Sequence, residues 1–203
     1  MVIEDFGLNI YIFKLINGID NPFLNKFFYY FSYLGSGYVL IPFLIITYVF
    51  RREKVKPFIL AIIVETATVV LLKEMFNQPR PASLLDNVKL LIPLYWHSFP
   101  SGDTAMAFTV ATVLSKGERL WVKISLFLYA SLVGFERIYV GVHFPLDVFF
   151  GAVIGLFSGI ISFKIISRWK DEEYKKSGFT RCRLGNEIFT RNKGNAKRNA
   201  SHN

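Results

Sequence analysis

The chain has 203 residues, of which 52% are hydrophobic, and its mean hydropathy is +0.35. The apolar residues come in long blocks rather than in alternation, which excludes an ordinary soluble domain and predicts an integral membrane protein. The net charge of +9 is typical of cytoplasmic loops beside anionic lipid. It gives little support for nucleic-acid binding, because no basic repeat is interleaved with aromatic residues.

Two further features limit the class of protein. The single Cys182 excludes an internal disulfide and a thiolate metal cluster. No cleavable signal peptide is expected, because Glu4 and Asp5 precede the first apolar residues and no basic segment stands before them.

The predicted elements follow from the polar breaks between the apolar blocks. Residues 6–19 are short and interrupted by polar side chains, which favours an interfacial helix. Residues 23–50 are broken at Gly35-Ser36-Gly37, so they form either one kinked span or two short helices. Further spans are predicted at residues 57–76, 103–115, 120–135 and 145–167. We expect an all-α integral membrane bundle of five to six transmembrane helices with an N-terminal interfacial helix.

Glycines recur at every fourth position of the last predicted span, at Gly151, Gly155 and Gly159. This spacing places small residues on one face of the helix, which predicts close packing against a neighbouring helix.

The basic segments predict the topology. Residues 51–56, residues 116–123 and the tail from Arg168 are cytoplasmic if the positive-inside rule holds. Loops 77–100 and 137–144 then share the extracytoplasmic side of a multi-pass protein of the cell membrane.

The chain divides near residue 168. Residues 1–168 form the membrane domain, and residues 169–203 form a basic, disordered cytoplasmic tail beside anionic lipids. The sequence does not predict an oligomeric state.

The first polar cluster of interest contains Lys73 and Arg80. Pro79 and Pro81 stiffen the backbone around Arg80 and hold it extended, so that it can point back toward Lys73. The alternative is a pair of basic residues that cap a helix C-terminus.

The second cluster, Pro100-Ser101-Gly102, opens a helix. Ser101 fits an N-cap, Gly102 permits close approach of a ligand, and the amides of a helix start attract anions. Taken alone, this cluster favours an ordinary capped helix.

The third cluster contains Arg137, His143 and Asp147. His143 can act as a nucleophile or carry a proton, and Asp147, one helical turn further on, can hold one ring nitrogen. Arg137 offers a planar fork suited to phosphate. A snorkelling Arg and an interfacial His are equally reasonable for this cluster alone.

Together the three clusters place cations, helix-start amides and one imidazole on the same predicted side of the membrane. Such a set can neutralise a phosphate group without a metal ion. We therefore expect a metal-independent site and no cofactor.

These motifs resemble those of the type 2 phosphatidic acid phosphatase family of membrane lipid phosphatases. The family motifs are Lys-x6-Arg-Pro, Pro-Ser-Gly-His and Ser-Arg-x5-His-x3-Asp, and this chain matches their order and internal spacing. The resemblance implies that His143, oriented by Asp147, attacks phosphorus and forms a phosphohistidine that water hydrolyses. It also implies phosphate ligands at Lys73, Arg80, Ser101, Gly102 and Arg137.

The resemblance also suggests the substrate. The size and layout are similar to those of small bacterial members that act on phosphatidylglycerol phosphate or undecaprenyl diphosphate. Phosphatidylglycerol phosphate is the preferred substrate on this basis, with undecaprenyl diphosphate and phosphatidate as alternatives.

The chain departs from the family pattern at two positions. Glu136 replaces a Ser, which we expect to be tolerated, and Asp103 stands where the family has the His that protonates the leaving oxygen. Asp103 can itself be held protonated; alternatively, His97 reaches in from the loop, or water protonates the product in a slower reaction. The first explanation is favoured over the second because it needs no rearrangement. A substitution made to trap an inactive form is a further explanation.

Two other functions remain open. One is a non-catalytic lipid-phosphate binder or transporter, which Asp103 supports. The other is a vanadate-dependent peroxidase, which has a similar anion site but is usually soluble.

Overall fold

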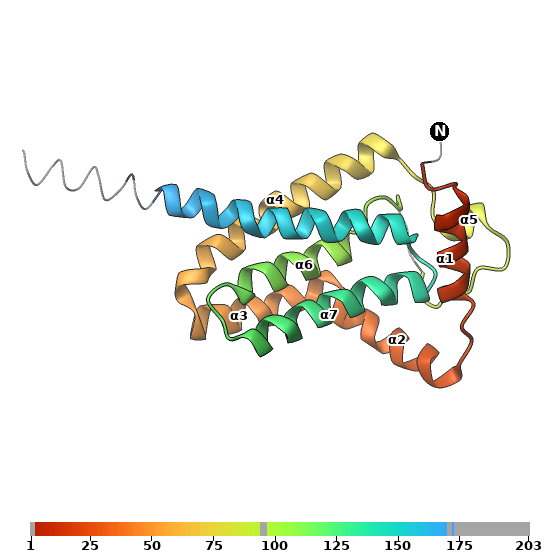
Figure 1. Cartoon of the computed structure of the whole chain (residues 1–203), viewed down its shortest axis with the longest axis horizontal. Coiled ribbons are helices and arrows are strands. Elements are labelled where there is room, and N and C mark those ends of the chain that lie inside the picture. Colours follow the sequence, from red (N-terminus) through yellow and green to blue (C-terminus); the bar gives the residue numbers. More distant parts are fainter. Residues whose placement is uncertain (1–2, 94–96, 170–171, 173–203) are drawn as a thin grey trace, which may run out of the picture. The chain divides into compact units, whose positions relative to one another are not determined.

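The computed structural model describes residues 3–93, 97–169 and 172, and these residues form helices and loops without a β-strand. Figure 1 shows the helices in chain order. They are α1 (Gly7–Asn17), α2 (Pro22–Gly35), the 3-10 helix η1 (Gly37–Val39), α3 (Leu40–Phe50), α4 (Arg52–Phe76), α5 (Pro81–Leu84), α6 (Gly102–Ser115), α7 (Leu120–Tyr139) and a last helix, Pro145–Trp169. The predicted all-α class is confirmed.

Residues up to Phe163 form one compact unit, which contains every contact discussed below, and residues from Lys164 onward form another. The predicted tail, 169–203, lies almost entirely outside the described residues.

Long apolar helices make this a membrane protein. Among the residues that the structure describes, two helical stretches are long and apolar enough to span a bilayer, Arg52–Leu84 and Pro145–Trp169. Large apolar side chains are exposed along the helices. The exposed fraction is 77% for Phe23 and 67% for Leu128. Such surface suits lipid rather than water. The predicted count of five to six spans is not confirmed.

The glycines near residue 36 produce a bend rather than a continuous helix. Helices α2 and η1–α3 meet at 53°, and together they make one broken span or a re-entrant pair. A side chain at Gly35 would begin 3.1 Å from the Val133 side chain and 3.3 Å from Arg137 Nη2. The bend therefore coincides with close packing of α2 on α7.

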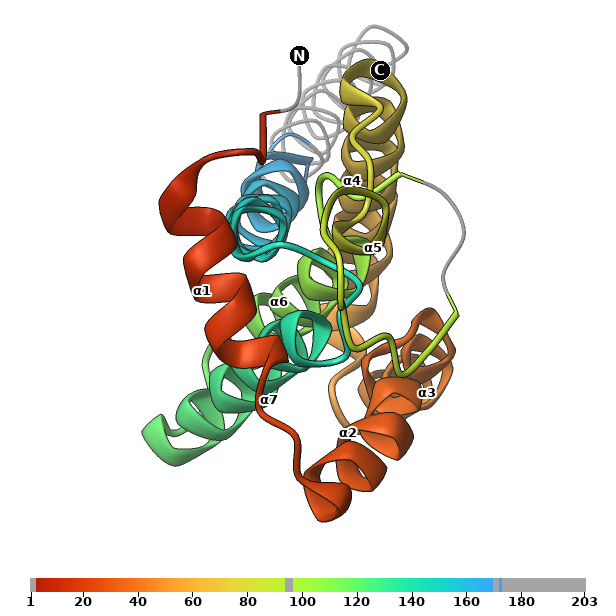
Figure 2. The same ribbon diagram turned by 90° about the vertical axis from the view of Figure 1, so that its right-hand side faces the viewer.

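Helix α6 lies among the other helices, and Figure 2 shows it surrounded by α4, α7 and the last helix. The last helix approaches α6 through its glycines, as predicted. A Cβ at Gly151 would lie 2.5 Å from the Ser101 carbonyl oxygen, and one at Gly159 would lie 2.6 Å from Thr112 Cγ2. This close packing brings the start of the last helix beside the start of α6.

The loops gather at two opposite ends of the bundle. At one end, Glu118 accepts hydrogen bonds from Arg51, at 2.8 Å, and from Lys54, at 2.7 Å, so two of the predicted cytoplasmic segments meet. At the other end, the amide of Leu91 donates to the Val140 carbonyl at 3.1 Å. Loops 77–100 and 137–144 therefore share one end, as the topology prediction requires.

Helix α1 lies across this second end (Figure 1). The Asn17 side-chain amide donates to the carbonyls of Tyr139, at 3.0 Å, and Lys89, at 2.9 Å. These bonds join α1 to the end of α7 and to the loop after α5. A helix in this position is consistent with the predicted interfacial location.

Candidate active site

His143 and Asp147 are brought together by the turn between α7 and the last helix. Gly141, with φ +86, lets the chain reverse after α7, and the amides of Val142 and His143 both donate to the Arg137 carbonyl. Asp147 stands in the first turn of the last helix, and its Oδ2 accepts the amide of Phe144 at 2.9 Å. The carboxylate therefore caps its own helix start and is fixed in place.

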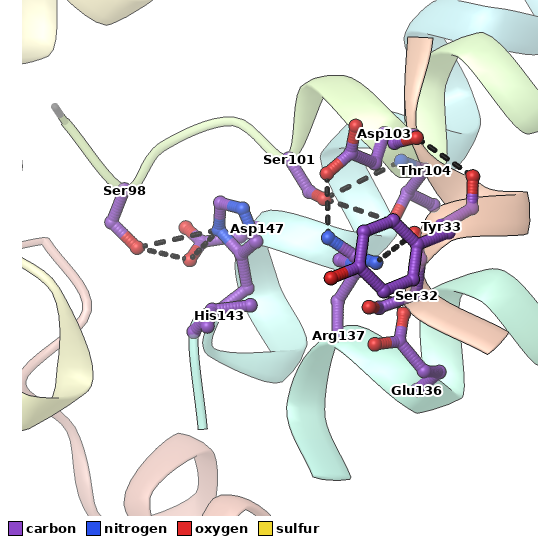
Figure 3. Close-up of polar contacts among 12 residues, drawn as sticks. Ser32, Tyr33, Ser98, Ser101, Asp103, Thr104, Glu136, Arg137, His143 and Asp147 are labelled. Atoms are coloured by element: carbon purple, nitrogen blue, oxygen red, sulfur yellow. Dashed lines mark hydrogen bonds and ion pairs between the residues drawn. The ribbon is translucent and has the colours of Figure 1, made fainter. Parts of the chain in front are cut away.

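The His143 ring is buried and faces Asp147. Its Nδ1 lies 3.1 Å from Asp147 Oδ2, and the Ser98 hydroxyl donates to the same oxygen at 2.6 Å (Figure 3). A proton on Nδ1 donates to the carboxylate and leaves the lone pair on Nε2. Burial lowers the pKa of His143 to about 4, although Asp147 acts in the opposite direction. The ring is therefore neutral at pH 7, which is the form that a nucleophile requires.

Lys73 and Arg80 converge on the same place from α4 and the loop after it. Lys73 Nζ donates to the carbonyls of His97, at 2.6 Å, and Ser98, at 3.1 Å. Arg80 Nη1 donates to the Val142 carbonyl at 2.7 Å, next to His143. Both cations thus lie beside the His143–Asp147 pair.

Ser101 caps α6, as predicted, and its amide donates to the Asp147 carbonyl at 3.1 Å. This bond joins the start of α6, including Gly102, to the start of the last helix. The second and third motifs are therefore adjacent in space.

Arg137 and Asp103 form an ion pair that the sequence did not predict. Arg137 Nη1 donates to Asp103 Oδ2 at 2.8 Å, and its Nε donates to Glu136. Its Nη2 donates to the Ser32 carbonyl at 3.1 Å, near the C-terminus of α2. Figure 3 shows this group apart from the cluster of Ser98, His143 and Asp147, with Ser101 between the two.

The predicted site residues thus gather at one end of the bundle, but in two groups. The His143 group comprises His143, Asp147, Lys73 and Arg80, and the Arg137 group comprises Arg137 and Asp103. Ser101 and Gly102 stand at the start of α6, where the Ser101 amide donates to the Asp147 carbonyl. Sequence reasoning missed Ser98, because a serine in a loop carries no sign of where its hydroxyl points. The sequence signal for Ser98 was its position just before the Pro100-Ser101-Gly102 motif.

Two curated relatives of this chain are named as phosphatases. An undecaprenyl-diphosphatase of Sulfolobus acidocaldarius is 32% identical over 171 residues, which cover 81% of each chain. A lipid A 4'-phosphatase of Porphyromonas gingivalis is 26% identical over 78% of this chain and 74% of its own.

Two crystal structures share the fold. LpxE of Aquifex aeolicus is 66% identical, with a TM-score of 0.79, over 81% of this chain and 99% of its own. A PAP2-type phosphatidylglycerolphosphate phosphatase of Bacillus subtilis is 26% identical, with a TM-score of 0.67, over 79% of this chain and 85% of its own. The PAP2 superfamily matches residues 54–171, which include all three motifs. The chain therefore belongs to the PAP2 superfamily of membrane lipid phosphatases.

Proposed function

We propose that this protein removes a terminal phosphate from a membrane lipid through a phosphohistidine at His143. The observation that carries the proposal is the buried, neutral His143 held by Asp147, with Lys73 and Arg80 beside it. A neutral imidazole with an oriented free nitrogen is a nucleophile, and flanking cations attract and stabilise a phosphoryl group.

The reaction runs in two steps. His143 Nε2 attacks phosphorus, the bond from phosphorus to the lipid oxygen breaks, and that oxygen leaves with a proton from a nearby acid. The charge that develops on the ring is stabilised through Nδ1–H and Asp147 Oδ2. Water then attacks phosphorus and gives a proton back to the acid, the bond from phosphorus to nitrogen breaks, and inorganic phosphate is released.

Cations take the part that a metal ion plays in other phosphatases. Lys73 and Arg80 neutralise the phosphoryl oxygens beside His143. Arg137 contacts the phosphate from the end of α7, and Ser101 and the Gly102 amide contact it from the start of α6. We propose that the reaction is metal-independent and that this end of the bundle faces the extracytoplasmic side.

Asp103 is proposed as the acid that protonates the leaving oxygen. Its carboxyl stands in the first turn of α6 and pairs with Arg137 at 2.8 Å. A bound phosphate competes for Arg137, which frees the Asp103 carboxyl to face the leaving oxygen. In the carboxylic acid form it can give that oxygen a proton.

The Asp103 role predicts a dependence on the leaving group. Asp103→Asn should lower kcat by about 10²-fold for a lipid, whose alkoxide needs a proton, because general acid catalysis contributes about that much. For an activated aryl phosphate, which leaves without a proton, the loss should be much smaller. Asp103→His, the family residue, should restore lipid turnover. Equal losses for both kinds of leaving group, measured by phosphate release, would contradict the acid role.

Phosphatidylglycerol phosphate is the proposed substrate, in agreement with the named activity of the Bacillus subtilis structure. Lipid A is a second candidate, because the Porphyromonas gingivalis relative is named for it. Undecaprenyl diphosphate is a third, from the Sulfolobus relative. These lipids share a terminal phosphate that the cations can hold.

A substrate panel tests the proposal. Purified full-length protein in mixed micelles should release phosphate from at least one of phosphatidylglycerol phosphate, lipid A, undecaprenyl diphosphate and phosphatidate. Comparison of kcat/KM among them should rank phosphatidylglycerol phosphate first. Release should be unaffected by a chelator, because the cations belong to the chain. Binding of these lipids without release would favour a non-catalytic binder or transporter.

A further inference from the structure

An acidic side chain from the N-terminal segment lies buried beside the candidate active site. Glu4 is fully buried, and it stands before α1, outside residues 54–171 where the superfamily matches. Its backbone is held in place: the carbonyl of Glu4 accepts the Asn9 side-chain amide at 2.8 Å, and Asn9 Oδ1 accepts the amide of Leu146 at 3.1 Å. Asn9 therefore ties Glu4 to the residue that precedes Asp147.

A second contact holds the same segment from the other side. The amide of Ile3 donates to Gln78 Oε1 at 2.9 Å, in the loop that carries Arg80. The N-terminal segment is thus attached both to the start of the last helix and to the first motif. Its position is set by the elements that build the candidate active site.

The carboxyl groups of Glu4 and Asp147 leave buried oxygens without a donor when both are ionised. Within the described part of the chain, these atoms are Glu4 Oε1, Glu4 Oε2 and Asp147 Oδ1. Unpaired buried oxygens of this kind are costly. The Asn9 contacts bring Glu4 to the start of the last helix, and the electrostatics couple its carboxyl to Asp147, so a proton on Glu4 would supply the donor that Asp147 Oδ1 lacks.

Glu4 is the carboxyl that holds the proton. Burial, followed by the interaction with Asp147, raises the pKa of Glu4 to about 10, while Lys73 and Arg80 act in the opposite direction. Two carboxyl groups in one buried site cannot both ionise easily, and Asp147 is the one whose Oδ2 accepts from Ser98, His143 and Phe144. Glu4 is therefore neutral at pH 7 and can donate.

We propose that Glu4 is a positioning residue, whose protonated carboxyl donates to Asp147 Oδ1 and keeps Asp147 Oδ2 directed at His143 Nδ1. With donors on both oxygens, the Asp147 carboxylate cannot rotate away from the ring, and His143 keeps its proton on Nδ1 and its lone pair on Nε2. The expected effect of Glu4 on kcat rests on the proposed function. Its expected effect on the His143 tautomer does not.

Two substitutions of similar volume test the proposal in the full-length protein. Glu4→Leu removes the donor while continuing to exclude water, and Glu4→Gln keeps an N–H donor that does not titrate. Glu4→Leu should lower kcat about 10- to 100-fold with little change in KM, a loss of the size found when the partners that orient metal-ligating histidines are removed. Glu4→Gln should stay close to the unmodified protein. Asp5→Leu, at an exposed neighbouring acid, is the matched control and should have no effect.

The tautomer of His143 gives a readout that does not depend on turnover. In ¹⁵N-histidine-labelled protein, with the His143 signal assigned from His143→Gln, Glu4→Leu should shift the ring away from the Nδ1–H form and Glu4→Gln should not. An unchanged tautomer in Glu4→Leu, or a Glu4→Gln that fails like Glu4→Leu, would overturn the proposal. If the unmodified protein releases no phosphate from any lipid, the proposed function fails, and the tautomer comparison still decides the role of Glu4.

Discussion

Replacing His143 with alanine should reduce phosphate release by about 10⁴-fold or more, as removal of a nucleophile does in other covalent mechanisms. His143 is the one buried imidazole among the described residues, and Asp147, Ser98 and the Arg137 carbonyl all serve to hold its ring and backbone. The cations beside it can still bind a lipid phosphate when the ring is absent. The loss should therefore appear in kcat, measured by phosphate release in mixed micelles, while KM changes little.

A second variant separates chemistry from folding. His143→Gln keeps a side chain that can hydrogen-bond to Asp147 but has no nucleophilic ring nitrogen. It should be as inactive as His143→Ala, while its melting temperature stays near that of the unmodified protein. Protein incubated with ³²P-labelled lipid and quenched in alkaline detergent should carry an acid-labile, base-stable phosphate in the unmodified chain and none in either variant. Appreciable turnover in His143→Gln would contradict covalent catalysis at this position.

Replacing Arg80 with alanine should lower kcat/KM by about 10²- to 10³-fold, comparable to the loss of one preorganised donor to a developing charge. Arg80 reaches the candidate site from a loop stiffened by Pro79 and Pro81, and its Nη1 contact with the Val142 carbonyl places the guanidinium beside His143. Without this cation, the phosphoryl oxygens lose a partner that carries full charge in a largely buried place. Arg80→Lys should recover part of the rate, because it restores the charge without the planar fork.

Arg51→Ala is the matched control for this variant. Arg51 is the same residue type, is half-exposed, and pairs with Glu118 at the opposite end of the bundle. Its removal should leave kcat/KM unchanged, because surface ion pairs contribute little and the phosphate site is remote. Near-normal turnover in Arg80→Ala, or a similar loss in Arg51→Ala, would mean that the cations beside His143 do not bind the phosphate.

Much of the candidate site could be predicted from the sequence because each motif is local. The intervals from Lys73 to Arg80 and from His143 to Asp147 are short, and each joins a helix end to the adjoining loop, so the two side chains of each pair stay close together. The N-cap at Ser101 and the packing glycines of the last helix are also local signals, and the structure confirms both. The alternation of basic segments correctly placed loops 77–100 and 137–144 at one end of the bundle.

Contacts between distant segments could not be predicted in the same way. Nothing near Asp103 in the chain indicates that Arg137 pairs with it, and the order of the motifs does not show that the site divides into two groups. Ser98 and Glu4 are an unremarkable loop serine and an acid near the N-terminus until the fold places Ser98 against Asp147 and buries Glu4, which Asn9 ties to Leu146. The angle between α2 and α3 could not be predicted either, because glycines permit a break in a helix without determining its angle.

The sequence by itself determined that this is a helical membrane protein with the three motifs of a lipid phosphatase family. Hydrophobic block length and motif spacing are properties of the linear chain, and they constrain each element separately. The tertiary structure alone decided which buried groups share protons and charges, because burial and pairing depend on what the rest of the fold brings within a few ångströms. Only the tertiary structure decides the protonation of His143, the pairing of Asp103 with Arg137 and the burial of Glu4.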